Sequence, residues 1–234
     1  MMPGGFAGVV MKLILILLVI VAFAGTANAQ QQPQERPDLG EQTVVNEDGG
    51  QTFIIKLAAS KPGGLIENRN GTNIPEIEQH SIFLGNRWAA PTLRGRESGL
   101  SNLLASVHEN AQVAELSQSG IKNLFGPVSS QEKLDIKSDR RISDLEIQRV
   151  LGAMLNEGSV PSPSAGAIYV VFLDPGLQST LGSLIAGKHY LAYHGFVNIS
   201  AMKVHYVVIP FEANSPLAYQ IALRALVVAA LHSL

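Results

Sequence analysis

The stretch AIYVVFL, Ala167–Leu173, decides the fold of this chain. All of its residues are apolar or aromatic, and an unbroken apolar run of this length is typical of a strand that is covered on both faces. The residues DPG at 174–176 follow the run and mark a turn. We therefore predict a central strand with other elements packed against each of its faces.

The sequence after this strand predicts a hairpin and a buried helix. Residues 189–196 (HYLAYHGF) and 204–209 (VHYVVI) are expected to pair as antiparallel strands. The stretch 176–187 is rich in Gly and Ser, and we expect it to be a surface loop. Ser215 as N-cap and Pro216 at the next position favour a helix start, and the apolar residues 217–234 predict that this helix is buried.

The sequence before the strand predicts two further helices and three strands. Ser143 and Glu146 form a capping box, in which each side chain accepts a hydrogen bond from a free N–H group at a helix start. Gly158 and Pro161 end that helix. Apolar residues at helical spacing predict a second helix from about Ser98. The strands are expected at 80–85 (HSIFLG), 121–128 and 134–137.

This order of elements indicates one α/β domain. We expect a mixed sheet of about five strands packed by about three helices. The domain should occupy residues 71–234. Residues 30–70 are rich in Gln, Pro, Glu and Gly, so they are expected to form a flexible arm, in which TFIIKL at 52–57 could pair as an isolated edge strand.

The first 29 residues have the layout of a secretory signal peptide. Lys12 supplies a positive charge, residues 13–24 form an apolar run, and Ala27 and Ala29 complete an A-x-A cleavage pattern. The run is shorter than the roughly 20 residues that a membrane span needs, although an uncleaved anchor is the alternative. We predict a secreted or periplasmic protein with no stable transmembrane segment after cleavage, and Met11 is the more typical start.

Composition excludes several classes of function. The formal net charge is −2, which argues against the clustered basic face that nucleic acid requires. The chain has no cysteine, so thiolate metal sites, a cysteine nucleophile and disulfides are excluded. Glycine-rich nucleotide loops and a G-x-S-x-G elbow are absent from the sequence. The aspartates at 135, 139 and 144 lack EF-hand spacing and are expected to be solvated.

Histidines are the candidate metal ligands. His189, His194 and His205 fall within 17 residues, and imidazoles on adjacent strands can share a metal ion or a proton. The sequence lacks H-x-H and H-x-x-x-H spacing, so we favour the interpretation that each ring is held by one hydrogen bond in a tyrosine-rich hairpin. The sole tryptophan, Trp88, could stack on a sugar, although a core or rim position is expected.

His232 could be aimed at the hairpin from the last helix. A zincin helix needs H-E-x-x-H, in which the glutamate is the general base. Here Ser233 follows His232 and the sequence ends at Leu234. We therefore predict no catalytic residue and no bound cofactor, with zinc held by His194, His205 and His232 as the alternative.

Four short motifs resemble one known family. They are IYVVFLDPG at 168–176, YHG at 193–195, HYVVI at 205–209 and IFLGNRW at 82–88. Together they resemble the bacterial relatives of the plant EXORDIUM-like, phosphate-induced proteins over about residues 71–232. The resemblance implies an extracytoplasmic α/β domain of largely unassigned biochemical role.

The chain departs from that family at two places. Some bacterial members carry a His-Glu pair like that of metallopeptidases on the last helix, and here His232 is followed by Ser233. The plant members carry cysteines that this chain lacks. The expected function is therefore non-catalytic binding of an unknown envelope or extracellular ligand. The alternatives are a metal-dependent hydrolase-like protein, or a relict of one truncated after Leu234.

Overall fold

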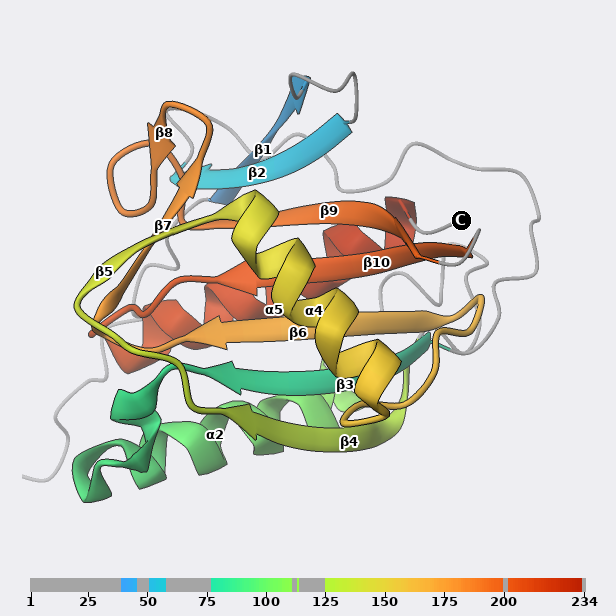
Figure 1. Cartoon of the computed structure of the whole chain (residues 1–234), viewed down its shortest axis with the longest axis horizontal. Coiled ribbons are helices and arrows are strands. Elements are labelled where there is room, and N and C mark those ends of the chain that lie inside the picture. Colours follow the sequence, from blue (N-terminus) through green and yellow to red (C-terminus); the bar gives the residue numbers. More distant parts are fainter. Residues whose placement is uncertain are drawn as a thin grey trace, which may run out of the picture. The chain divides into compact units, whose positions relative to one another are not determined.

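The computed structural model describes residues 39–45, 51–57, 77–110, 113, 125–199 and 202–232, all of which belong to the unit that begins at Pro37. They form the predicted α/β fold, built around a seven-stranded mixed sheet of order β1-β2-β9-β10-β6-β3-β4 (Figure 1). The strands of this sheet are β1 (Leu39–Val45), β2 (Gln51–Leu57), β3 (Ile77–Leu84), β4 (Phe125–Leu134), β6 (Ala167–Leu173), β9 (Ala192–Ile199) and β10 (Met202–Ile209).

The helices cover both faces of this sheet. They are α2 (Arg94–Ala105), α4 (Asp144–Glu157) and α5 (Ser215–His232), with short 3-10 turns η1 (Asn86–Ala89), η2 (Pro91–Leu93) and η3 (Val107–Glu109). A small second sheet contains β5 (Arg140–Ser143), β7 (Leu177–Leu181) and β8 (Leu184–Ile185). Helix α4 crosses one face, whereas α2 and α5 lie on the other (Figure 1).

Strand β6 is the central strand that its sequence predicts. It pairs in parallel with β10 on one side and β3 on the other, and all of its residues are buried. Alternate residues point to opposite faces: Ile168 and Val170 join the core beside α5, and Tyr169 and Val171 join the core beside α4. The apolar run of β6 is unbroken because helices cover both faces of the sheet at this strand.

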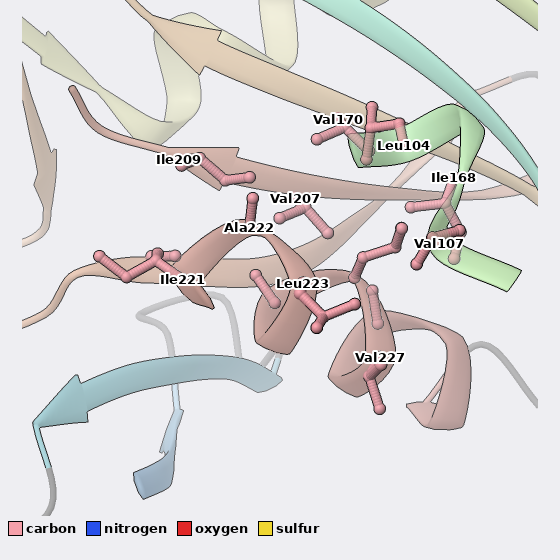
Figure 2. Close-up of a cluster of buried hydrophobic side chains, with 14 of the residues drawn as sticks. Leu104, Val107, Ile168, Val170, Val207, Ile209, Ile221, Ala222, Leu223 and Val227 are labelled. Atoms are coloured by element: carbon pink, nitrogen blue, oxygen red, sulfur yellow. The ribbon is translucent and has the colours of Figure 1, made fainter. Parts of the chain in front are cut away.

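Helix α5 carries apolar residues on nearly all of its sides, and most of them are buried. Figure 2 shows Ala222 of α5 next to Val207 and Ile209 of β10, and Ile221 and Leu223 belong to the same core cluster. The full burial of one such aliphatic side chain contributes roughly 1.5–3 kcal/mol. Within the described part of the chain, no helix has both the length and the apolar character needed to cross a bilayer.

Several local predictions are confirmed. The hairpin forms as β9 and β10, which pair antiparallel. Helix α4 begins after Ser143, whose hydroxyl accepts a hydrogen bond from the backbone N–H of Glu146 at 3.3 Å, and it ends at Gly158 in the left-handed conformation. Helix α5 begins as expected, but its cap is Asn214, whose side chain accepts from the backbone N–H of Leu217 at 3.0 Å.

The expected arm at 30–70 is wrong for two segments. Strands β1 and β2 lie within it, and β2 pairs with both β1 and β9, so it is an inner strand rather than an isolated edge strand. Strand β1 was missed because polar residues such as Gln42 interrupt its apolar ones, and β2 was expected only as an isolated edge strand because no partner was predicted on either side of it. The rest of the predicted arm, like the signal peptide, lies outside the described residues.

Two further predictions are corrected. The stretch 176–187 is not a simple surface loop, because β7 and β8 form a hairpin in it that packs Leu177 and Leu181 into the core beside α4. The strand expected at 134–137 is wrong, because β4 ends at Leu134, residues 135–137 are in no strand, and the next strand is β5. Residues 121–124 lie outside the described residues.

Candidate functional site

The hairpin brings two of the predicted metal ligands together. In the register of β9 and β10, His194 lies opposite Val207 and His205 lies opposite Phe196, so the two histidines are diagonal neighbours on the face toward α5. Both are buried, with 1% and 5% of their surface exposed. The Nε2 atom of His194 lies 3.1 Å from the Nδ1 atom of His205.

The two imidazole rings meet edge to edge. Their planes differ by only 16°, and their centroids are 5.3 Å apart. The separation of the centroids nearly equals the 3.1 Å between the two nitrogens plus one ring radius on each side. The two nitrogens therefore lie close to the line that joins the centroids. The facing nitrogens are therefore well placed to share one proton, with one donating and the other accepting.

This arrangement does not match a zinc site. Tetrahedral zinc takes nitrogen ligands at about 2.0–2.1 Å, with lone pairs that converge on the ion. The facing nitrogens of His194 and His205 instead point at each other. Among the described residues, no group of three His, Cys, Asp or Glu side chains could hold a metal ion. His232 is the last residue of α5, and its side chain lies outside the description.

Two other histidines with described side chains, His80 and His189, lie apart from the pair. The Nδ1 atom of His189 accepts a hydrogen bond from the backbone N–H of Ile185 at 2.9 Å, which holds the turn after β8. His80 of β3 is on the opposite face of the sheet, with its ring centroid 5.1 Å from that of Tyr169. Burial lowers the pKa of His80, and the charge of Glu78 opposes this shift.

Asp144, the first residue of α4, is buried, so the expectation that it is solvated is wrong. Its Oδ1 atom accepts hydrogen bonds from the hydroxyls of Tyr193 at 2.8 Å and Tyr206 at 2.7 Å, and its Oδ2 atom accepts from Gln148 at 2.7 Å. Burial, and then the charge of Asp144, raises the pKa of Tyr193 well above its usual value. Tyr193 therefore stays neutral, and the hydrogen bonds of Tyr193 and Tyr206 to Asp144 attach α4 to the hairpin.

A second buried carboxylate organises the carboxyl ends of β3 and β6. Asp174 accepts hydrogen bonds from the backbone N–H groups of Arg87 at 2.7 Å and Gly176 at 2.8 Å, and from the hydroxyl of Ser138. Arg87 lies in η1, and Ser138 and Gly176 lie outside the helices and strands. The carboxylate thereby ties the turn after β3 to the turn after β6 and to the segment before β5.

A shallow hollow opens beside these turns. The turn after β3 and the chain after β10 both pass to the α5 face, whereas β7 takes the chain after β6 to the α4 face. Such divergence leaves a crevice at the carboxyl ends of the strands. The hollow is lined by Trp88, Arg96, Leu100, Phe172, Leu173, Ile209, Pro210, Phe211, Glu212 and Ala218.

The floor of the hollow is aromatic and its rim is charged. Trp88 is 2% exposed and donates its indole N–H to the carbonyl of Phe172 at 3.2 Å, so it has the core position rather than the stacking role on a sugar. The guanidinium of Arg96 lies 5.5 Å from the ring centroid of Phe211 and donates to the carbonyl of Ala213 at 2.7 Å. The free volume, about 10 Å³, holds about one water molecule.

Sequence reasoning missed this hollow and the Asp144 cluster. The only signal for the cluster was the density of tyrosines in the hairpin, and the signal for the hollow was Trp88 after a predicted strand. Comparison with protein-family models, with curated proteins and with solved structures gives no match. The resemblance to the EXORDIUM-like family therefore remains a prediction that rests on the four motifs.

Proposed function

We propose that this chain is a secreted or periplasmic α/β domain that binds a component of the cell envelope and does not catalyse a reaction. The observation that carries this proposal is the hollow at the carboxyl ends of β6 and β10. Open α/β sheets bind their ligands at this end of the strands, where neighbouring connections pass to opposite faces. The predicted signal peptide supports the location outside the cytoplasm.

The chemistry of the hollow suggests the kind of ligand. Aromatic rings form its base, and Arg96 and Glu212 lie at its rim, so an apolar group next to a polar or charged group would fit. Enclosed small-molecule pockets usually measure about 300–1,000 Å³, far more than the space here. A surface that is shallow and preorganised by Asp174 suits a polymer or a protein better than an enclosed metabolite.

Membership of the EXORDIUM-like family is part of this proposal. Three of the four motifs lie on adjacent strands, since the motif at 168–176 covers β6, YHG lies in β9 and HYVVI lies in β10. The fourth, IFLGNRW, covers the end of β3 and reaches Trp88 at the hollow. This grouping supports a shared fold and places the motifs next to the proposed binding surface.

The test uses the fact that Trp88 is the only tryptophan. Purified protein is mixed with isolated cell-wall material or with lipid vesicles, and binding is followed by co-sedimentation and by Trp88 fluorescence with soluble wall fragments. Ala218→Leu fills the hollow and should weaken binding, whereas Ala153→Leu makes the same change on an exposed position of α4. Equal binding by both variants, or no binding to envelope material, would contradict the proposal.

A metal-dependent hydrolase-like function is the second candidate. The observation that favours it is the 3.1 Å approach of the His194 and His205 nitrogens. Hydrolytic zinc needs three protein ligands and an open position for water, so this candidate requires rotation of both rings and a further ligand such as His232. Metal analysis, described in the Discussion, separates the two candidates.

A further inference from the structure

We propose that the His194–His205 pair is a binding site for a soft monovalent d10 metal ion, Cu(I), for which Ag(I) is a redox-inert substitute. The site lies between β9 and β10 under the α5 face. It is independent of the hollow at the carboxyl ends, so it can exist whether or not the chain binds the envelope there.

The direction of the two lone pairs favours two-coordinate binding. The facing nitrogens are 3.1 Å apart, and the rings are within 16° of a common plane with their centroids 5.3 Å apart. A two-coordinate d10 ion takes its ligands from opposite sides, which is the arrangement of these nitrogens. The ion would take the place of the shared proton and push the rings slightly apart, without the rotation that zinc requires.

The surroundings favour a single positive charge. The ring of Phe53 lies 5.8 Å from that of His194 and within 14° of parallel, and Phe196 lies 6.2 Å from His205. The ammonium of Lys203 is 4.3 Å from the ring centroid of Phe196. A buried divalent ion would need negative partners to offset its desolvation, whereas these three contacts are two aromatic faces and one cation. Imidazole is a good ligand for copper.

Binding of the ion to the histidine pair requires no proton acceptor or other reactant from outside. The neutral pair holds two ring protons, one of them between the facing nitrogens. When the ion binds, that proton moves to the other nitrogen of the ring that donated it. Both rings then stay neutral and each gives one lone pair to the metal, so the bound pair carries the single charge of the ion. No electron is transferred, because the metal enters as a monovalent ion.

The experiment titrates the full exported chain with Ag(I) in a chloride-free buffer. The chain has no cysteine, so no thiolate competes for the ion. Calorimetry should detect one high-affinity site per chain. His194→Phe and His205→Phe should each weaken it at least about tenfold, and the matched variant His108→Phe, at an exposed histidine, should leave it unchanged.

A second measurement does not depend on the folding of variants. In wild-type protein with ¹⁵N-labelled histidine, Ag(I) should shift the Nε2 resonance of His194 and the Nδ1 resonance of His205 and couple to both. Unchanged resonances at these two nitrogens would overturn the proposal. Zn²⁺ binding to the same two nitrogens as tightly as Ag(I) would also overturn it and would support the hydrolase-like candidate instead.

Discussion

The carboxylate of Asp174 occupies the space that a side chain on Gly85 would need. A Cβ atom at Gly85 would lie 2.3 Å from the Oδ2 atom of Asp174, well inside van der Waals contact. Gly85 also has φ 119° and ψ 148°, a backbone conformation that is essentially restricted to glycine. The turn after β3 can therefore reach the buried carboxylate only because residue 85 has no side chain.

Gly85→Ala should lower the free energy of unfolding by several kcal/mol, because it combines backbone strain of roughly 1–3 kcal/mol with displacement of a hydrogen-bonded buried carboxylate. Gly182→Ala is the matched control, since Gly182 also has positive φ but nothing within 4 Å of its Cβ position. It should cost about 1–2 kcal/mol. Urea unfolding measures both values, and equal losses would show that Asp174 does not restrict position 85.

Tyr193→Phe should destabilise the protein more than Tyr190→Phe. Tyr193 donates its hydroxyl proton to the carboxylate of Asp144, whereas Tyr190 donates to the neutral hydroxyl of Ser179. A hydrogen bond to a charged group contributes about 1.5–3 kcal/mol and a neutral one about 0.5–1.5 kcal/mol. Both changes remove one oxygen from a buried ring, so packing losses nearly cancel in the comparison. A larger loss for Tyr190→Phe would contradict the assignment of Asp144 as the centre of the cluster.

Asp144 and the helix that begins with it show where prediction from sequence fails and where it succeeds. Asp144 was expected to be solvated because its partners, Tyr193 and Tyr206, are 49 and 62 residues away along the chain. Helix α4, which begins with Asp144, was predicted well, because the Ser143 cap and the Gly158 terminus act within a few residues. Contacts within one turn can be predicted from local chemistry. Whether a carboxylate is buried or exposed depends instead on the distant strands that pack against it.

The strands show the same limit. Strand β6 was predicted because burial on both faces imposes an apolar run. Strand β1 (LGEQTVV) has a mixed composition that fits a loop equally well, and only its pairing with β2 identifies it. The hairpin predicted from the sequence already placed His194 and His205 on adjacent strands. The edge-to-edge orientation of their rings was not predicted, because it depends on packing against Phe53 and α5, which the local sequence pattern does not specify.

Stability should fall as the pH rises from about 10 to about 12. Burial, the largest cause, raises the pKa of Tyr169 and of Tyr190 to about 12, whereas tyrosine in an unfolded chain has a pKa near 10. Above pH 10 the unfolded state loses these protons and the folded state keeps them, so unfolding becomes more favourable until the folded pKa is reached. Urea midpoints measured across this range test the slope, and Tyr169→Phe should reduce it. A flat profile would be inconsistent with neutral buried tyrosines.

Val171→Asp should cost several kcal/mol, because Val171 lies in the core beside α4 with 2% of its surface exposed and would become an unpaired buried charge. Val228→Asp should have a similar effect in α5, where Val228 is 1% exposed. Ala153→Asp, at an exposed position of α4, is the control and should change stability little. A typical domain is stable by only about 5–15 kcal/mol, so either core variant should lower the urea midpoint strongly, and an unchanged midpoint would refute the placement.

Purified protein should contain no stoichiometric zinc, and a chelator should leave its folding unchanged. The reason is the orientation of the two hairpin imidazoles, whose facing nitrogens lie 3.1 Å apart and point at each other instead of converging on an ion. His232→Ala should then affect stability only. Metal analysis after mild purification in zinc-supplemented medium provides the measurement, with His108→Ala as the control for exposed histidines. One zinc ion per chain that is lost in His194→Ala or His232→Ala would mean that α5 supplies a third ligand and rotates the pair, and the hydrolase-like function would then replace envelope binding as the better proposal.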